Sequence, residues 1–221
     1  LLQKMNTLDP RYYPITISQI TKKLSAHLKK DRLDFFIIHG DRFETFAATI
    51  ASTSMNIPTI QLEAGDITNG GTYDDVVRHS ISRLSHLLLT TNKDSQQRLI
   101  KQGEEKWRVN NIGVSSLSKI KNKKYASKIE IKKKFHINFD KPIIIFTFHP
   151  LSLNISKTKK HIKICVESLI ALSKIVNVII TYPNDDYGSK YIISEYKKLK
   201  KYKNIFLIKS LGKYFYHSLM N

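Results

Sequence analysis

The sequence predicts an α/β protein with two halves, each built around a parallel sheet. Short apolar stretches alternate with amphipathic stretches of helical length along the chain. The apolar stretches are nearly continuous in isoleucine, leucine and phenylalanine, which is typical of parallel strands buried on both faces. This alternation breaks once, in a basic stretch near residues 114–140, and then restarts. A repeated strand–helix rhythm of this kind favours parallel sheets in both halves.

The first half contains four expected strands and four expected helices. The stretch 17–30 carries Ile17, Ile20, Leu24 and Leu28 at helical spacing. Strand, turn, helix and strand then follow one another as a βαβ unit. The expected strands are 34–40, 57–63, 86–91 and 107–113, and the expected helices are 17–30, 42–56, 74–85 and 93–103.

The second half repeats the pattern after a different kind of segment. Residues 114–140 are very basic and poor in positions suited to burial, so we expect a helical bridge there. The predicted domains are therefore an N-terminal domain at 1–115, a bridge at 116–140 and the start of a C-terminal domain at 141–221. Within the last of these, the expected strands are 141–150, 176–183 and 204–210, and the expected helices are 160–175, 189–201 and 211–221.

Composition excludes several classes of protein. A hydrophobic content of 41% suits a globular core, and no apolar run approaches the roughly 20 residues of a membrane span. The first residues lack the charged and apolar regions of a signal peptide. Cys165 is the single cysteine, so no intrachain disulfide can form. A cytoplasmic location is the simplest prediction.

Positive charge is concentrated in the second half. Residues 1–115 hold 15 Lys/Arg and 12 Asp/Glu, whereas residues 116–221 hold 22 and 6. A nucleic-acid or membrane surface is one interpretation. The basic stretches lack the regular aromatic residues of nucleic-acid-binding modules. We therefore favour lysines on solvated helix faces, with no nucleic-acid or membrane partner, and keep an anionic substrate as a third interpretation.

Polar residues follow several predicted strands at the point where each strand ends. In open parallel α/β sheets, ligands bind at the carboxyl ends of the strands. The sequence therefore predicts functional residues among those that come directly after a strand: His39, Gly40, Asp41 and Arg42; Glu63, Ala64, Gly65 and Asp66; His149 and Pro150; and Tyr182, Pro183 and Asn184.

Two of these residues are carboxylates at matching positions after neighbouring strands. Asp41 has an alternative role as a helix N-cap, with Glu44 completing a capping box. Glu63 stands between an apolar strand and Ala64-Gly65, so we expect partial burial. Burial and a neighbouring carboxylate both raise the pKa of a carboxyl group. Carboxylates in such surroundings serve as general acids and bases.

A further acidic pair, Asp74 and Asp75, opens the helix 74–85. One acid can complement the helix dipole, and Arg78 one turn later can pair with either acid or contact a phosphate. We expect His79 to pack or form hydrogen bonds rather than to catalyse. Gly70-Gly71 makes the preceding loop free to move. Asp66 has no evident chemical use, and we expect a structural role for it.

His149 precedes a proline at a strand end, where it could donate to a phosphate or transfer a proton. The common dinucleotide, P-loop, zinc-protease and hydrolase motifs are absent from the sequence. The histidines and the cysteine do not cluster at metal spacing. We therefore expect no metal and no cofactor.

Taken together, the motifs resemble those of the UDP-N-acetylglucosamine 2-epimerase family. The stretches that carry the resemblance, in order, are IIHGDRFETFAATIAS, IPTIQLEAGDITNGGTYDDVVRHSISRLSHLLLTTN, RLIKQGEEKWRVNNIG, FTFHPLS and ITYPN. They cover nearly the whole chain from about residue 14. The elements GDRFE, DDVVRHSISRLSHL and TYPN favour the hydrolysing branch, which serves sialic-acid and legionaminic-acid pathways in bacteria.

The resemblance implies two Rossmann-like domains of the GT-B type and a UDP-sugar substrate. It implies elimination of UDP to a glycal, followed by hydration with inversion at C2. By motif position, the implied catalytic residues are Asp41, Glu63, one of Asp74 and Asp75, and His149. The implied substrate-binding residues are Arg42, Gly65, Arg78, His79 and Asn184. A homo-oligomer, dimeric or tetrameric, is expected of the full-length protein.

The chain departs from the family pattern at a few positions. Gln61 stands where relatives often have histidine, Ala64 replaces a frequent glycine, and the acidic pair is Asp-Asp. We expect a piece of a longer two-domain protein, without the family's first strand and its Ser- and Gly-rich turn. The alternatives to a hydrolysing epimerase are a non-catalytic nucleotide-sugar-binding fragment, a GT-B glycosyltransferase and a basic nucleic-acid-binding protein.

Overall fold

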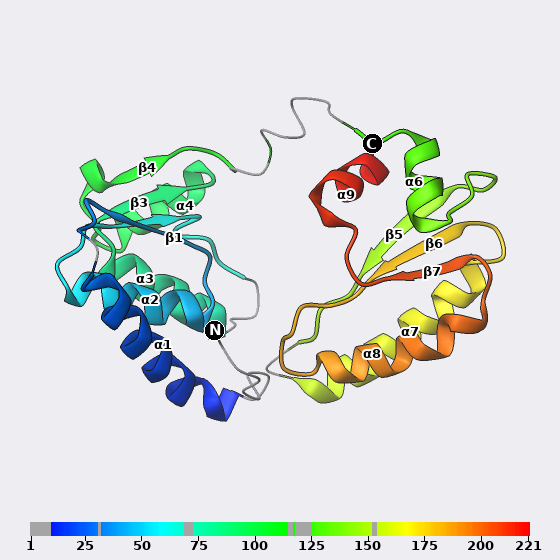
Figure 1. Cartoon of the computed structure of the whole chain (residues 1–221), viewed down its shortest axis with the longest axis horizontal. Coiled ribbons are helices and arrows are strands. Elements are labelled where there is room, and N and C mark those ends of the chain that lie inside the picture. The colour runs from blue at the N-terminus through cyan, green and yellow to red at the C-terminus, as the bar shows by residue number, and fades with distance from the viewer. Residues whose placement is uncertain (1–9, 31, 69–72, 115–116, 118–124, 152–153) are drawn as a thin grey trace. The chain divides into compact units, whose positions relative to one another are not determined.

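The computed structural model describes residues 10–30, 32–68, 73–114, 117, 125–151 and 154–221. The chain divides into two compact units, Leu1–Leu117 and Ser118–Asn221. Each unit is an α/β structure with its own parallel sheet (Figure 1). The predicted fold class is confirmed.

The first unit has a parallel sheet in the order β1-β2-β3-β4, with a helix between each pair of successive strands. Helix α1 packs along α2, and α2 packs along α3. Its elements are η1 (Pro10–Tyr12), α1 (Tyr13–Leu28), β1 (Phe36–His39), α2 (Phe43–Ser54), β2 (Thr59–Leu62), α3 (Tyr73–Leu84), β3 (Leu87–Thr90), α4 (Lys93–Lys101), η2 (Lys106–Arg108) and β4 (Val109–Asn111).

One residue from each strand forms a row across the first sheet. These residues pair in register and therefore point to the same face: Ile38, Gln61, Leu88 and Val109. Helices cover this face, since Ile38 packs with two residues of α3, and Leu88 packs with Leu99 of α4. All four residues of the row are buried. The order of the strands thus brings α3 over the centre of the sheet.

The opposite face of β1 differs from the prediction. A strand buried on both faces was expected, yet the side chain of Ile37 is 54% exposed and its neighbour Ile38 is buried. The prediction is wrong for β1, because helices cover the face on which Ile38 lies and leave Ile37 exposed on the other face. It is correct for β6 of the second unit, in which every residue is buried.

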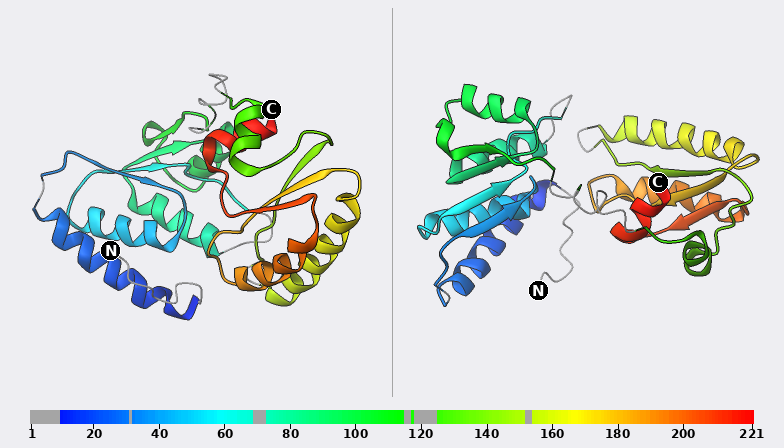
Figure 2. Two further views of the ribbon diagram at one scale, coloured as in Figure 1. Left: turned by 45° about the vertical axis from the view of Figure 1, so that its right-hand side comes forward. Right: turned by 90° about the horizontal axis from the view of Figure 1, so that it is seen from above.

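The second unit has a parallel sheet in the order β5-β6-β7. Helices α7 and α8 lie on one face of this sheet, and α6 and α9 lie on the other (Figures 1 and 2). Its elements are α6 (Lys128–Phe135), β5 (Ile143–Thr147), α7 (Ile155–Leu172), β6 (Asn177–Thr181), α8 (Ser189–Lys197), η3 (Lys198–Lys201), β7 (Ile205–Ile208) and α9 (Gly212–Met220).

The alternation of side chains along β6 explains this layering. Val178 and Ile180 point into a core formed with α7 and α8, where Tyr196 is also fully buried. Ile179, between them, points into a second core that includes Ile131 and Leu211. Successive residues of a strand face opposite sides of the sheet, so one apolar strand supports two helical layers.

The predicted basic bridge lies partly outside the described residues, which resume at residue 125. In the described part of the bridge, residues 125–140, the helix is α6, which begins with a capping box between Ser127 and Glu130. It ends at His136, whose left-handed backbone (φ 57°) stops the helix. Ile131 and Ile137 are buried in the core of the second unit. The prediction of few buried residues missed this packing because lysines dominate the stretch.

Candidate active site

The first candidate site lies at the carboxyl ends of β1 and β2 in the first unit. β1 ends at His39 and is followed by Asp41, and β2 ends at Leu62 and is followed by Glu63. His39 and Leu62 are paired across the two parallel strands. The loop after β2 leads to α3, whose first turn carries Asp74 and Asp75. The topology therefore brings acids from three segments to one edge of the sheet.

Arg78 of α3 joins two of these acids, Asp41 and Asp75. Its Nη1 donates to Asp75 Oδ1 at 2.7 Å and to the carbonyl oxygen of Asp66 at 2.8 Å. Its Nη2 pairs with Asp41 Oδ2. The arginine side chain is only 11% exposed, so these pairs are shielded from water. One buried guanidinium thus offsets two carboxylates that would otherwise repel each other.

Asp41 is therefore not the helix cap that was offered as its alternative role. The N-cap residue of α2 is Arg42, and no side chain caps that end. The Asp41 carboxylate pairs instead with Arg78, 37 positions further along the chain. Arg42 donates from Nε to Glu44 at 3.2 Å, which also takes Glu44 away from a capping box.

The acidic pair at the start of α3 is divided between two environments. Asp75 accepts the backbone N–H of Thr68 at 2.9 Å in addition to the Arg78 bond. Burial raises the pKa of the Asp75 carboxyl. The Thr68 hydrogen bonds and the Arg78 charge together lower this pKa by more than burial raises it, so it lies below its ordinary value. Asp74 is exposed at the helix start. Asp75 is thus the ionised, anchored member of the pair.

Glu63 has an unusual backbone. Its φ of 61° lies in the left-handed region, which residues other than glycine rarely adopt. Its carboxylate Oε1 lies 3.3 Å from His39 Nε2, and the side chain is 33% exposed, as the expected partial burial requires. Strained conformations of this kind persist where the surrounding structure holds them, often at functional sites.

The residues that follow Glu63 fasten the loop to α4. Asp66 accepts hydrogen bonds from Thr91 Oγ1 at 3.1 Å and from the Ser95 hydroxyl. Gly65 has a φ of 81°, and a Cβ added there would lie 2.8 Å from the Leu99 side chain. The structural role expected of Asp66 agrees with these contacts. Packing accounts for glycine at position 65, and its predicted contact with substrate stays a prediction. Gly70-Gly71 lies outside the described residues.

His79 is directed elsewhere. It lines a separate cavity of about 500 Å³ with Val76, Ser80, Ser82, Arg83, Gln102 and Glu104. Its Nδ1 is buried, and the described residues offer it no hydrogen-bond partner. Burial and the nearby Arg78 charge lower the pKa of the imidazole below its ordinary value. The Asp75 charge acts in the opposite sense and raises this pKa, and the predicted contact of His79 with substrate stays a prediction.

The second candidate site is a cavity of about 480 Å³ at the carboxyl ends of β5, β6 and β7, within the second unit. It contains both residues predicted in this half, His149 and Asn184. None of the residues that line this cavity in the described structure is acidic. The lining is Thr147, His149, Thr181, Tyr182, Pro183, Asn184, Lys209, Ser210, Leu211, Gly212, Lys213, Tyr216 and His217.

Several residues at the two sites were missed from the sequence. Lys209 comes directly after β7, so its place at a strand end is a signal in the sequence, whereas Lys213 lies in the first turn of α9. His217 comes from α9 and gives no such signal. His39 is a strand-end residue to which the sequence gives no role, and its Nε2 lies 3.3 Å from Oε1 of Glu63.

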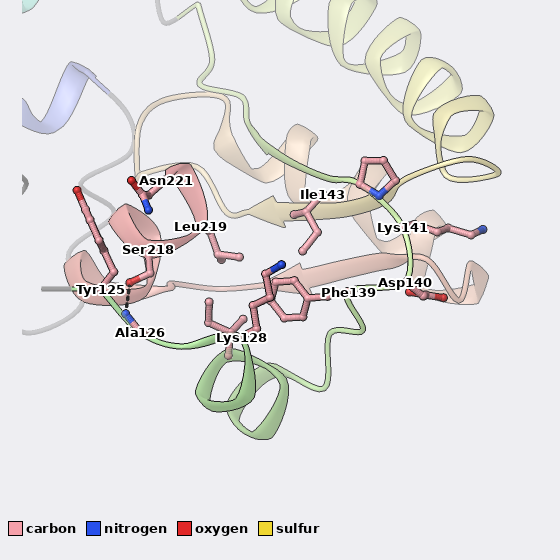
Figure 3. A pocket seen from close by; sticks show the side chains of 12 residues that line it. Tyr125, Ala126, Lys128, Phe139, Asp140, Lys141, Ile143, Ser218, Leu219 and Asn221 are labelled. Atoms are coloured by element: carbon pink, nitrogen blue, oxygen red, sulfur yellow. Dashed lines mark hydrogen bonds between the residues drawn. The ribbon is translucent and has the colours of Figure 1, made fainter. Parts of the chain in front are cut away.

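A larger cavity, about 600 Å³, lies near the start of β5 (Figure 3). Residues from α6 and α9 line it, and Ser218 Oγ there accepts the backbone N–H of Ala126 at 2.7 Å. Ile143, its contribution from β5, is the first residue of that strand. It therefore lies at the amino end of β5, away from the edge where such sheets bind ligands.

The described residues contain no group of three or more His, Cys, Asp or Glu side chains placed to hold a metal ion. Likewise, no described helix is both long enough and apolar enough to cross a membrane.

The fold and the two sites define a class of protein. It is a two-unit parallel α/β protein of the GT-B type, with paired acids at the strand ends of one unit and a cationic cavity at those of the other. A sequence profile described as UDP-N-acetylglucosamine 2-epimerase matches residues 13–221. The chain belongs to this family, which confirms the resemblance seen in the sequence.

Individual relatives support the same assignment. The GDP/UDP-N,N'-diacetylbacillosamine 2-epimerase (hydrolyzing) of Campylobacter jejuni is 35% identical over 190 residues, which cover 85% of this chain and 49% of the relative. The UDP-N,N'-diacetylbacillosamine 2-epimerase (hydrolyzing) of Legionella pneumophila is 31% identical over 166 residues, covering 74% and 43%. The chain thus spans about half the length of the curated relatives it matches.

A solved structure has the same fold. The UDP-GlcNAc 2-epimerase of Neisseria meningitidis, bound to UDP-GlcNAc, superposes with a TM-score of 0.75 and 22% sequence identity. The match covers 94% of this chain and 57% of that protein.

Proposed function

We propose that this chain carries acid–base and nucleotide-binding residues of a hydrolysing 2-epimerase that acts on UDP-N-acetylglucosamine or a related UDP-linked acetamido sugar. The products would be UDP and the free 2-epimerised sugar, of the N-acetylmannosamine type, for the synthesis of sialic-acid-like sugars. The observation that carries this proposal is the set of carboxylates held around Arg78 at the strand ends, next to the strained Glu63.

The reaction needs carboxylates on account of its proton transfers. In the first step, a base removes the C2 proton, the C–H electron pair forms the C1=C2 bond, and UDP leaves with the C1–O pair. In the second step, water adds to C1 and loses a proton to a base. C2 receives a proton from an acid on the face opposite to the one from which the first proton was removed, which inverts C2. Positioned carboxylic acids and carboxylates perform both kinds of transfer.

We assign these transfers to Glu63, Asp41 and Asp74. Glu63 follows the central strand β2 and is partly buried, and Asp41 follows the neighbouring strand. Asp74 is exposed in the first turn of α3, whereas Asp75 is anchored by Thr68 and Arg78. We therefore give Asp75 a positioning role: it keeps Arg78 in place beside Asp41.

The second unit is proposed to bind the nucleotide. Its cavity presents Lys209 and Lys213 beside His149 and His217. Such groups offset the charge of a diphosphate and stabilise it as a leaving group. The Asn184 amide and the Tyr182–Pro183 surface could contact the uridine part. This role also agrees with the third interpretation of the positive charge in this half, in which lysines bind an anionic substrate.

The test is incubation of the chain with UDP-N-acetylglucosamine and with UDP-N,N'-diacetylbacillosamine, without an acceptor. The latter is included because the two relatives described above carry that sugar in their names. We expect phosphorus NMR to show UDP, and proton NMR to show the free 2-epimer. Calorimetric binding of UDP without turnover would instead favour a non-catalytic binding fragment. Product formation only after an acceptor is added would favour a glycosyltransferase.

We also propose that the protein assembles as a homodimer or homotetramer and works in the cytoplasm. The family resemblance supports the first proposal, and the single cysteine supports the second. Light scattering tests the assembly: a monomeric mass at micromolar concentration would contradict it. Cell fractionation tests the location.

A further inference from the structure

We propose that His39 is a positioning residue that holds Oε1 of Glu63 and so directs Oε2 toward the sugar. This inference rests on the proposed function, because it assigns a partner to the carboxylate that transfers the C2 proton. It goes beyond the acid–base set, since His39 acts through Glu63 and does not itself touch the reacting atoms.

The sheet register creates this pair. His39 is the last residue of β1 and is paired with Leu62, the last residue of β2. Glu63 comes one residue later, where an extended backbone would carry the chain on past the sheet. Its left-handed φ of 61° instead turns the chain at this point. As a result, Nε2 of His39 and Oε1 of Glu63 lie 3.3 Å apart, close enough for the imidazole N–H to attract the carboxylate.

The other charged groups at this edge have partners among themselves. Asp41 and Asp75 pair with Arg78 from α3. Asp66 accepts from Ser95 and Thr91, and Arg42 pairs with Glu44. The Glu63 carboxylate instead lies against the imidazole of His39, with Oε1 at 3.3 Å from Nε2. The two residues therefore form a unit distinct from the cluster around Arg78.

This geometry gives the two carboxylate oxygens different tasks. The imidazole N–H at Nε2 of His39 interacts with Oε1 of Glu63. The lone pairs of Oε2 are then available to accept the C2 proton. Fixing the carboxylate in one rotamer also limits the motion of the base relative to C2. Misplacement of a catalytic group by about 1 Å can cost roughly 100-fold in rate.

The kinetic test uses the full chain and compares His39→Ala with His39→Gln. The alanine variant removes the donor, whereas glutamine can still donate from its amide. We expect His39→Ala to lower kcat for UDP release about 30-fold with KM within about twofold, and His39→Gln to recover kcat to within about threefold. The control is His161→Ala, an exposed histidine of α7 in the second unit, which should change nothing.

A double-mutant cycle shows whether His39 acts through Glu63. In a Glu63→Gln background, His39→Ala should change kcat less than twofold, because the group that it positions is gone. An equal loss in both backgrounds, or a His39→Ala kcat within twofold of wild type, would overturn the proposal.

A second measurement needs no turnover. Long-range ¹H–¹⁵N spectra of the imidazole should show a proton fixed on Nε2 of His39 in the wild-type chain and a mixture of tautomers in Glu63→Ala. An unchanged tautomer would overturn the pairing. If the wild-type chain released no UDP while the tautomer responded as expected, the proposed function would fail and the pairing would stand.

Discussion

The two units share one architecture but present opposite charge at the same edge of their sheets. In the first unit, the strand ends carry Asp41, Glu63 and the acidic start of α3, and a buried arginine joins Asp41 to Asp75. In the second unit, the strand ends form a cavity with lysines and histidines. Parallel α/β topology fixes where ligands bind, and the residues placed there decide the chemistry. We assign proton transfer to the first unit and anion binding to the second.

The largest expected effect comes from removing the central acid of the first unit. Glu63→Gln should lower the rate of UDP release by about 10²- to 10⁴-fold, the usual contribution of a positioned acid or base. The measurement is a coupled UDP assay at saturating substrate. The matched control is Glu167→Gln, an exposed glutamate of α7 in the second unit, which should retain the wild-type rate. A near-normal rate for Glu63→Gln would remove the acid–base role from the first unit.

Loss of the arginine should damage the first unit itself. Arg78→Met leaves the Asp41 and Asp75 carboxylates without their shared cation in a poorly exposed site. Breaking such a pair typically costs about 3 kcal/mol in the free energy of unfolding. Urea denaturation measures this loss. Lys198→Met removes a lysine with a 60% exposed side chain from its pair with Glu195 in the second unit, and it should cost under about 1 kcal/mol. Equal losses would mean that Arg78 is not the centre of a buried network.

Asp75 should give the first unit a specific dependence on pH. The pKa of its carboxyl is lower in the folded chain than in the unfolded chain. Its stabilisation is therefore present above the unfolded pKa, about 3.9, and is lost as pH falls through the folded pKa. Asp75→Asn should lower the free energy of unfolding by about 2 kcal/mol at pH 7, and the difference should shrink below about pH 4.

The neighbouring acid supplies the control for this measurement. Asp74→Asn, at the exposed start of the same helix, should lose under about 0.5 kcal/mol. If the loss in Asp75→Asn stayed constant down to pH 2, ionisation of Asp75 would not be its cause.

The smallest expected effect lies in the second unit. Lys213→Met should weaken UDP binding about tenfold, since one cation near a diphosphate contributes about 1.4 kcal/mol, and should leave uridine binding unchanged. Isothermal calorimetry measures both ligands. Lys160→Met, on the exposed surface of α7, should bind UDP normally. A similar loss in both variants would make the effect one of overall charge rather than of the cavity.

Local sequence patterns predicted the strands and helices well because each element carries its own signal. The mostly apolar run at 176–183 predicts β6, and the spacing of apolar residues predicts α1. Patterns predicted less about exposure. Ile37 and Ile38 are the same residue type, and only the placement of the helices shows which one is covered.

Within the site, sequence position predicted which residues reach the strand ends but not how they pair. Asp41 and Arg78 are far apart in the chain, and their contact depends on α3 crossing the sheet. The choice between Asp74 and Asp75 was open for the same reason: adjacent residues on a helix point in different directions, and Asp75 is the one reached by Thr68. The left-handed backbone at Glu63 gives no signal in the sequence, because glycine usually occupies such positions.

The most direct test of the account is the fate of the C2 proton. UDP-N-acetylglucosamine is incubated with the chain in heavy water, and the released sugar is examined by NMR and mass spectrometry. Our account predicts a 2-epimerised product with one deuterium at C2, formed together with UDP, and its absence in Glu63→Gln. UDP release with the C2 hydrogen retained would contradict proton transfer by the carboxylates of the first unit.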